Sequence, residues 1–164
     1  MFARTKRLIL RPGWSEDAPA LAAALGNDDV VRTMIHAPRP YDIDDAMQYL
    51  HRPRDPRLPD FLAFARTGGA PRLVGGCSVI SRDSRLELGY WVARPFWGLG
   101  FATEAAEAVM RIARATHIGR VTSVHTRDNK ASGNVLRKLG FRPTGRTEER
   151  VSAKRNTRFT CVEF

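Results

Sequence analysis

The sequence contains few cysteines and no long apolar run, and both shortages exclude classes of protein. The two cysteines among 164 residues, Cys77 and Cys161, lie too far apart in sequence for the paired spacing of a zinc site, and they are too few for a disulfide framework. No stretch approaches the roughly 18 apolar residues of a membrane span. The apolar run near the N-terminus, Leu8 to Leu10, is too short for a secretory signal. We therefore expect a cytoplasmic protein without a membrane partner or a metal, with both thiols reduced and buried.

Acidic residues are fewer than basic residues. The chain has 27 Lys and Arg against 17 Asp and Glu, a net charge of +10. One interpretation is a nucleic-acid binder, since clustered cations release counterions from phosphate. The other is a scattered, solvated surface with some charge gathered around an anionic cofactor. The cations are spread along the chain and form no block of five or six like charges, so we expect nucleic acid not to be a partner.

The pattern of apolar residues predicts one mixed domain over residues 1–164, of the α/β (α+β) class. After a first strand at 5–12, helical periodicity predicts helices, with Ser15 as the N-cap of the first. The pattern then changes to three strands joined by short turns, which predicts an antiparallel meander. The expected helices are 18–25, 27–35, 42–51, 102–116 and 130–139, and the expected later strands are 61–66, 73–81, 86–93, 120–126, 146–152 and 158–164.

The most informative stretch runs from Glu87 to Ala105, where a strand leads into two glycines, Gly98 and Gly100, and a strong helix begins at once. Glycines permit close backbone approach, and N–H groups at a helix N-terminus attract anions. The pyrophosphate of a nucleotide-like cofactor suits such a turn, although a tight strand-to-helix corner would also need glycine. A P-loop would need Lys and Ser or Thr after its second glycine, and the dinucleotide fingerprint needs a third glycine where Thr103 stands. Neither motif fits.

Three blocks in order carry a resemblance that covers nearly the whole chain: 5–12, 88–105 and 129–141. They are similar to the GNAT superfamily of N-acetyltransferases, and within it to the RimJ/RimL-like branch of ribosomal-protein N-terminal acetyltransferases. The resemblance implies a mixed, mostly antiparallel twisted sheet with helices on both faces, splayed between the strands around Val92 and Val124. It also implies acetyl-CoA as cosubstrate and no metal.

The resemblance implies a set of cofactor-binding residues. Main-chain N–H groups of the glycine turn would hold the pyrophosphate, and the end of the preceding strand would pair with the pantetheine arm and polarise the thioester carbonyl. Arg94 could equally be a solvated surface charge. The residues are Tyr90, Trp91, Val92, Ala93, Arg94, Gly98, Leu99, Gly100, Phe101, Ala102, Thr103, Asn129 and Asn134.

Two residues are candidates for the proton chemistry. Many family members carry a tyrosine where this chain has Leu136, and the resemblance gives the role of proton donor to Ser132 instead. A serine in a first helical turn can also simply bond the backbone. Glu87 is the candidate base, acting directly or through water, and its alternative is a solvent-facing strand glutamate.

The resemblance therefore implies an acetyl-CoA-dependent N-acetyltransferase that acts by direct attack in a ternary complex. The acceptor would be a primary amine on a protein N-terminus or a small molecule, such as an amino acid, a polyamine or an antibiotic. The alternative is a catalytically silent CoA-binding or RNA-associated module of the same fold. The long helix and the C-terminal strands offer surfaces for a homodimer.

Overall fold

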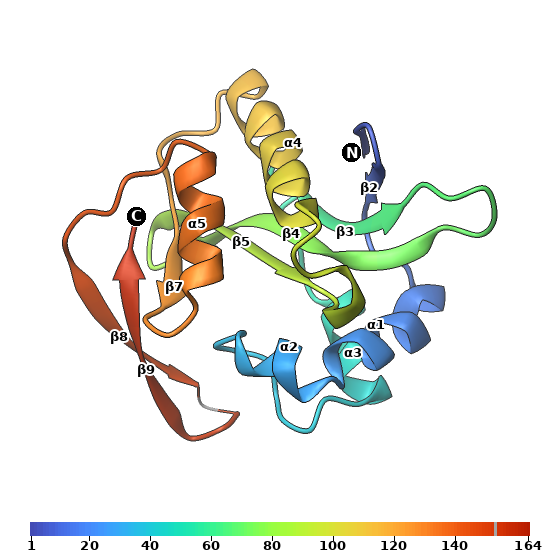
Figure 1. Ribbon diagram of the computed structural model, residues 1–164, viewed down its shortest axis with the longest axis horizontal. Helices are drawn as coiled ribbons and strands as arrows, with labels where there is room; N and C mark the ends of the chain where they lie inside the picture. The colour runs from blue at the N-terminus through green and yellow to red at the C-terminus, as the bar shows by residue number, and fades with distance from the viewer. Residues whose placement is uncertain (153) are drawn as a thin grey trace.

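The computed structural model describes residues 1–152 and 154–164. Its elements alternate in the order expected for a mixed α/β fold, with two short 3-10 turns before α1 and α4 (Figure 1). The elements are β1 (Ala3–Arg4), β2 (Leu8–Arg11), η1 (Ser15–Asp17), α1 (Ala18–Leu25), α2 (Asp28–Arg32), α3 (Ile43–His51), β3 (Asp60–Ala65), β4 (Arg72–Arg82), β5 (Arg85–Val92), η2 (Arg94–Phe96), α4 (Phe101–Ala115), β6 (Val121–Thr122), β7 (Val124–Thr126), α5 (Lys130–Lys138), β8 (Thr147–Ser152) and β9 (Thr157–Glu163).

The strands form two sheets. The larger has the order β1-β2-β3-β4-β5-β6, antiparallel up to β5, with a parallel pair between β5 and β6. The smaller has the order β7-β9-β8 and is antiparallel throughout. The predicted meander is therefore present as β3-β4-β5, and the prediction of a mixed, mostly antiparallel fold is confirmed.

The predicted strand 120–126 is divided in two at Ser123. Its first part, β6, pairs with β5 at Leu86 and Glu87, and its second part, β7, pairs with β9. Ser123 exchanges two backbone hydrogen bonds with Phe164, 3.1 and 2.9 Å long, and its hydroxyl donates to the Leu88 carbonyl at 2.8 Å. These bonds turn the chain out of the large sheet, so β5 and β7 diverge beyond Leu88.

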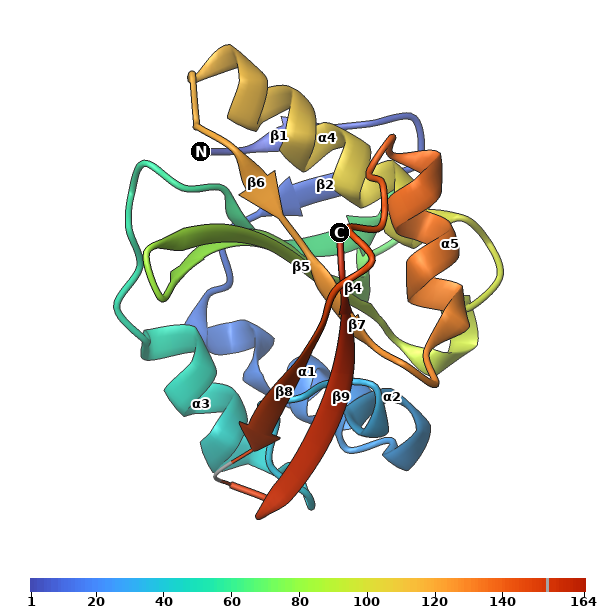
Figure 2. The ribbon, with the colours of Figure 1, turned by 90° about the vertical axis from the view of Figure 1, so that its left-hand side faces the viewer.

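Helices cover both faces of the large sheet, as predicted (Figures 1 and 2). On one face α4 buries Ala106 and Val109 against strand residues such as Leu88. On the other face α1, α2 and α3 pack in a second core that includes Trp91. Because successive side chains of a strand alternate between faces, β5 presents Leu88, Tyr90 and Val92 to the face that α4 covers, and Glu87 and Trp91 to the opposite face.

Two local predictions were wrong at the N-terminus. The first three residues of the strand predicted at 5–12 form the turn between β1 and β2, in which the Leu8 amide donates to the Thr5 hydroxyl at 2.9 Å, so the strand begins only at Leu8. Asp17, not Ser15, organises the start of the first helical segment, since its carboxylate accepts from the Trp14 amide at 2.8 Å and pairs with Arg11 at 2.7 Å.

Both cysteines are buried and free, as predicted. Burial raises the pKa of the Cys161 thiol to about 11 and that of Cys77 further still. Neither thiol is therefore ionised near neutral pH. Over the described residues, the helices are too short or too polar to cross a membrane.

Candidate active site

The glycine turn has the backbone of an anion-binding loop. Gly98 and Gly100 have φ angles of +75° and +79°, a region that side chains disfavour. Gly100 is the N-cap of α4. Because glycine has no side chain to cap the helix, the first N–H groups of α4 are left for a ligand. The structure thus brings the predicted residues 98–103 together as an exposed loop running into a helix N-terminus.

Residues of the turn between β1 and β2 form hydrogen bonds to this loop and to the first turn of α4. Arg7 donates from Nη1 to the Leu99 carbonyl at 2.9 Å and from Nε to Glu104 at 2.6 Å, and its guanidinium lies 4.3 Å from the Phe101 ring centroid. Thr5 donates to the same carboxylate at 2.6 Å. Burial alone would raise the pKa of Glu104, but the hydrogen bonds from Thr5 and Arg7 outweigh it and lower that pKa. Sequence reasoning missed Arg7, although it lies in the first of the three similar blocks.

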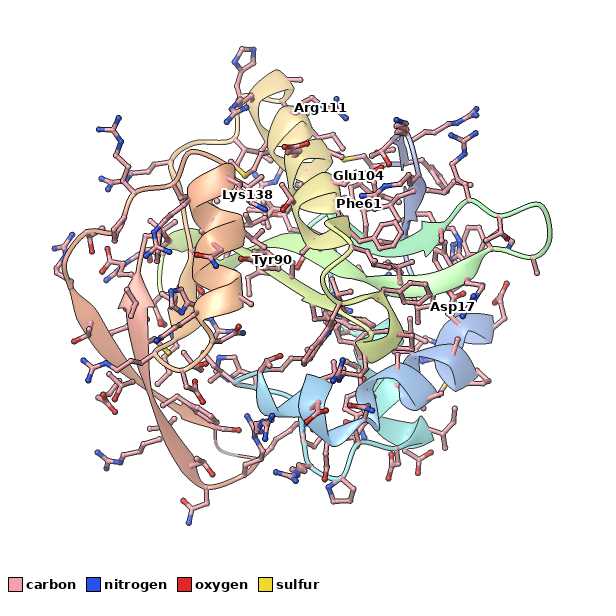
Figure 3. The ribbon with its side chains drawn as sticks, viewed as in Figure 1. Asp17, Phe61, Tyr90, Glu104, Arg111 and Lys138 are labelled. Atoms are coloured by element: carbon pink, nitrogen blue, oxygen red, sulfur yellow. The ribbon has the colours of Figure 1, made fainter. Side chains whose placement is uncertain are left out.

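An open groove of about 870 Å³ extends from this loop along α4. Figure 3 places Glu104 and Arg111 on α4 and Lys138 on the neighbouring α5. Five cationic and two acidic side chains line the groove, and this excess of positive charge attracts anions. The lining residues are Arg4, Thr5, Lys6, Arg7, Gly100, Thr103, Glu104, Glu107, Arg111 and Lys138.

One edge of β5 opens toward β7. The Leu86 and Leu88 carbonyls accept from Thr122 and Ser123, whereas the Ala93 amide donates to β4. Backbone groups alternate in direction along a strand, so the N–H and C=O of Tyr90 and the N–H of Val92 point toward the diverging strand. This open stretch of the edge ends at the Val92 carbonyl, which accepts from the indole N–H of Trp97 at 2.7 Å. A ligand between the strands would therefore meet main-chain donors at residues 90 and 92.

The start of α5 meets Tyr90 across this opening. The Tyr90 hydroxyl lies 2.8 Å from Ser132 Oγ and 2.9 Å from the Ser132 carbonyl oxygen. Asn129 caps α5 by accepting from the Ser132 amide at 3.2 Å. Three residues predicted separately thus form one cluster. Asn134 lies outside it, exposed, and accepts from Arg137 at 3.3 Å.

Glu87 lies on the opposite face of β5 from Tyr90. It is 7% exposed and pairs with Arg150 through two hydrogen bonds, one of them 2.9 Å long, and with Arg82 at 3.5 Å. The hydrogen bonds that Arg150 donates to Glu87 and Glu148 outweigh burial and raise the pKa of Arg150. The structure therefore does not place Glu87 beside Ser132, and it gives Glu87 a partner on β8 that no local sequence signal indicates.

The groove at Glu87 has a volume of about 300 Å³ and a lining that mixes both signs of charge. It lies between the α2–α3 connection, the β4–β5 hairpin and β8. Its lining residues are His36, Arg82, Asp83, Arg85, Glu87, Glu148, Glu149, Arg150 and Val151. In residues 1–152 and 154–164, no three His, Cys, Asp or Glu side chains gather as metal ligands would.

Several predicted cofactor residues have packing roles for their side chains. Trp91 and Ala93 belong to the core beneath α1–α3, and Phe101 belongs to the core beneath α4. Arg94 donates to Asp29 on α2 at 3.1 Å and lies 4.7 Å from the Trp97 ring centroid. Any contact of these residues with a cofactor would therefore use mainly their backbone.

Comparison with known proteins agrees with this geometry. Residues 7–142 match the family model described as an acetyltransferase (GNAT) domain. The chain is 27% identical over 155 residues to YoaA of Bacillus subtilis (strain 168), an uncharacterized N-acetyltransferase, covering 86% of this chain and 82% of YoaA.

Solved structures share the fold. The structure of a candidate ribosomal-protein-serine acetyltransferase from Vibrio cholerae superposes with a TM-score of 0.79 at 17% identity, covering 100% of this chain and 97% of the other. The microcin C7 self-immunity acetyltransferase MccE, solved with acetyl-CoA and AMP, gives 0.77 at 14% identity, covering 97% and 91%. These structures show the fold, and the family match over residues 7–142 shows that the chain belongs to the GNAT family of acetyltransferases, acyl-transferring enzymes whose cosubstrate is acetyl-CoA.

Proposed function

We propose that this enzyme transfers the acetyl group of acetyl-CoA directly to a primary amine, with both substrates bound at once. The observation that carries the proposal is the arrangement around β5. The candidate base, Glu87, and the candidate acid, Ser132, lie on opposite faces of this strand, and main-chain N–H groups line the edge between them. An amine can therefore approach from one side while the thiolate departs on the other.

The cofactor half of the site follows from the loop and the groove. The N–H groups of residues 98–103 suit the pyrophosphate, and the cations of the adjoining groove suit the remaining phosphate. The N–H groups of Tyr90 and Val92 point to where a thioester carbonyl would lie between β5 and β7. Such fixed donors stabilise the charge that develops on the carbonyl oxygen without reorganisation.

The acceptor half involves Glu87. Its side chain lies on the opposite face of β5 from Tyr90, and its two arginine partners, on β4 and β8, hold the carboxylate in place. From there Glu87 takes a proton from the amine, directly or through one water. The groove lined by both signs of charge gives the amine a polar approach to this carboxylate.

We assign the enzyme to the RimJ/RimL-like branch, with a protein N-terminus or a small-molecule amine as acceptor. Ser132 in the first turn of α5, together with a buried leucine at position 136, supports this assignment. The likeness to the Vibrio cholerae structure points the same way at the level of the fold.

The first experiment is calorimetric titration with acetyl-CoA and with CoA. The Gly98→Asp/Gly100→Asp variant places two carboxylates in the anion loop and should abolish binding. Gly69→Asp, in the exposed β3–β4 turn where an added Cβ meets nothing within 4 Å, is the matched control and should bind normally. Lack of binding by the folded wild-type protein would contradict the proposal, as would equal binding by the loop variant.

The second experiment measures thiol release with a panel of peptide N-termini, amino acids, polyamines and aminoglycosides. Glu87→Gln and Ser132→Ala should retain CoA affinity while turnover falls by roughly a hundredfold or more, as loss of acid–base catalysis predicts. A wild-type protein that binds acetyl-CoA and acetylates none of these amines would argue against amine transfer.

A further inference from the structure

The Tyr90 hydroxyl is held against the first turn of α5 by two contacts to one residue. It lies 2.9 Å from the Ser132 carbonyl oxygen and 2.8 Å from Ser132 Oγ. Asn129 fixes the Ser132 amide at 3.2 Å, so the backbone of Ser132 is fixed independently of Tyr90. What Tyr90 adds is control over the direction of a hydroxyl that would otherwise rotate freely.

The two hydroxyls have two possible hydrogen-bond arrangements. In the first, Ser132 donates to the Tyr90 oxygen and Tyr90 donates to the Ser132 carbonyl. In the second, Tyr90 donates to Ser132 Oγ, and the serine proton is free to point elsewhere. Both use the same short distances and require no movement of the backbone.

We propose that Tyr90 is a positioning residue that turns the Ser132 hydroxyl toward the departing sulfur of acetyl-CoA. This inference rests on the proposed function. In the resting protein the pair adopts the first arrangement. When negative charge develops on sulfur, Ser132 donates to it and Tyr90 donates to Ser132 Oγ. The Ser132 oxygen then accepts a hydrogen bond from Tyr90, and this strengthens the hydrogen bond that Ser132 donates to the sulfur.

The electron and proton balance is simple. The amine lone pair forms the C–N bond, the C–S bond breaks, and its electron pair stays on sulfur. The amine proton passes to Glu87 or water. The departing thiolate takes the hydroxyl proton of Ser132, which Ser132 regains from solvent as CoA leaves. Tyr90 keeps its proton and acts only as a hydrogen-bond donor.

The surroundings of Tyr90 suit a donor that stays protonated. Burial is the largest influence and raises the pKa of Tyr90 to about 12, although the bond to Ser132 opposes this shift. The hydroxyl therefore keeps its proton through the pH range in which amines are acetylated. Leu136, one turn further along α5, is fully buried and has no hydroxyl to offer.

The test measures the ionisation of the CoA thiol bound to the whole enzyme. Thiolate absorbance in the ultraviolet is followed against pH for the CoA complex, with the desulfo-CoA complex as the blank that cancels protein tyrosines and thiols. Wild-type protein should lower the pKa of the bound thiol. Tyr90→Phe should raise the pKa of the bound thiol again, so that its ionisation constant falls by about three- to tenfold, which corresponds to the loss of one hydrogen bond. The same variant should lower kcat by a similar factor.

Two comparisons separate positioning from a structural role. Ser132→Ala should show a larger loss, and adding Tyr90→Phe to it should change neither the thiol pKa nor kcat further, because Tyr90 acts only through Ser132. Tyr49→Phe, on α3 against Arg52, removes another tyrosine hydroxyl and should match the wild type. Circular dichroism and CoA titration establish that each variant is folded and binds.

A wild-type level of thiol ionisation and kcat in Tyr90→Phe would overturn the inference. An equal loss from Tyr90→Phe with and without Ser132 would also overturn it. Both outcomes leave acetyl transfer intact. A folded wild-type protein that binds no CoA would instead overturn the proposed function, and the inference with it.

Discussion

Replacing Arg7 with Met would release the anion loop from the β1–β2 turn while keeping the aliphatic part of the side chain. The substitution removes the 2.9 Å bond to the Leu99 carbonyl, the 2.6 Å pair with Glu104 and the contact over the Phe101 ring. It leaves Gly98, Gly100 and the first turn of α4 in place. The loop must then be ordered by the cofactor itself, which costs binding free energy.

The size of this cost follows from the exposure of the contacts. The Arg7 side chain is 43% exposed, so solvent screens its pair with Glu104, which contributes only about 0.5 kcal/mol. The hydrogen bond to Leu99 contributes about 1 kcal/mol, and the cation–π contact about 0.5 kcal/mol. A total of about 1–2 kcal/mol corresponds to a roughly 5- to 30-fold weaker Kd for acetyl-CoA.

The assay compares calorimetric Kd values for acetyl-CoA and for acetyl-pantetheine, which lacks the pyrophosphate. Only the affinity for acetyl-CoA should fall, so the ratio of the two Kd values should change by the same 5- to 30-fold factor. Arg57→Met removes an exposed arginine that pairs with Asp55 at 2.7 Å far from the loop, and it should leave both values unchanged. A ratio unchanged in Arg7→Met would refute the claim that Arg7 preorganises the loop.

Two further predictions concern stability. The pKa of Glu104 is lowered in the folded protein, so the stability that its carboxylate contributes is present above its ordinary value of 4.5 and is lost as the pH falls through the folded pKa. The difference in unfolding free energy between wild type and Glu104→Gln, measured by urea denaturation, should therefore shrink below pH 4.5, and a constant difference would contradict it. In Gly133→Ala the new Cβ would lie 2.8 Å from Nε2 of the buried His125. We expect the free energy of unfolding to fall by about 1–2 kcal/mol despite the better helix propensity of alanine. The loss should shrink in a His125→Ala background. A gain in stability would show that the His125 side chain moves aside without cost.

The sequence by itself determined the features that depend on neighbouring residues. The glycines at 98 and 100, the helix after them and the β3-β4-β5 meander follow from backbone freedom, helical periodicity and short turns. Each involves residues within a few positions of one another, so the local pattern suffices. For the same reason most element bounds agree with the predictions to within one or two residues.

Tertiary structure decided the partners within the candidate site. Arg7 meets Glu104 across 97 positions, Glu87 meets Arg150 across 63, and Tyr90 meets Ser132 across 42. The break at Ser123 depends likewise on its pairing with Phe164. No local pattern specifies such pairs, because they depend on which strands lie together and in what register. The candidate residues could thus be named from the sequence. Only the fold shows that Ser132, on α5, lies beside one face of β5 and that the Glu87 side chain lies on the other.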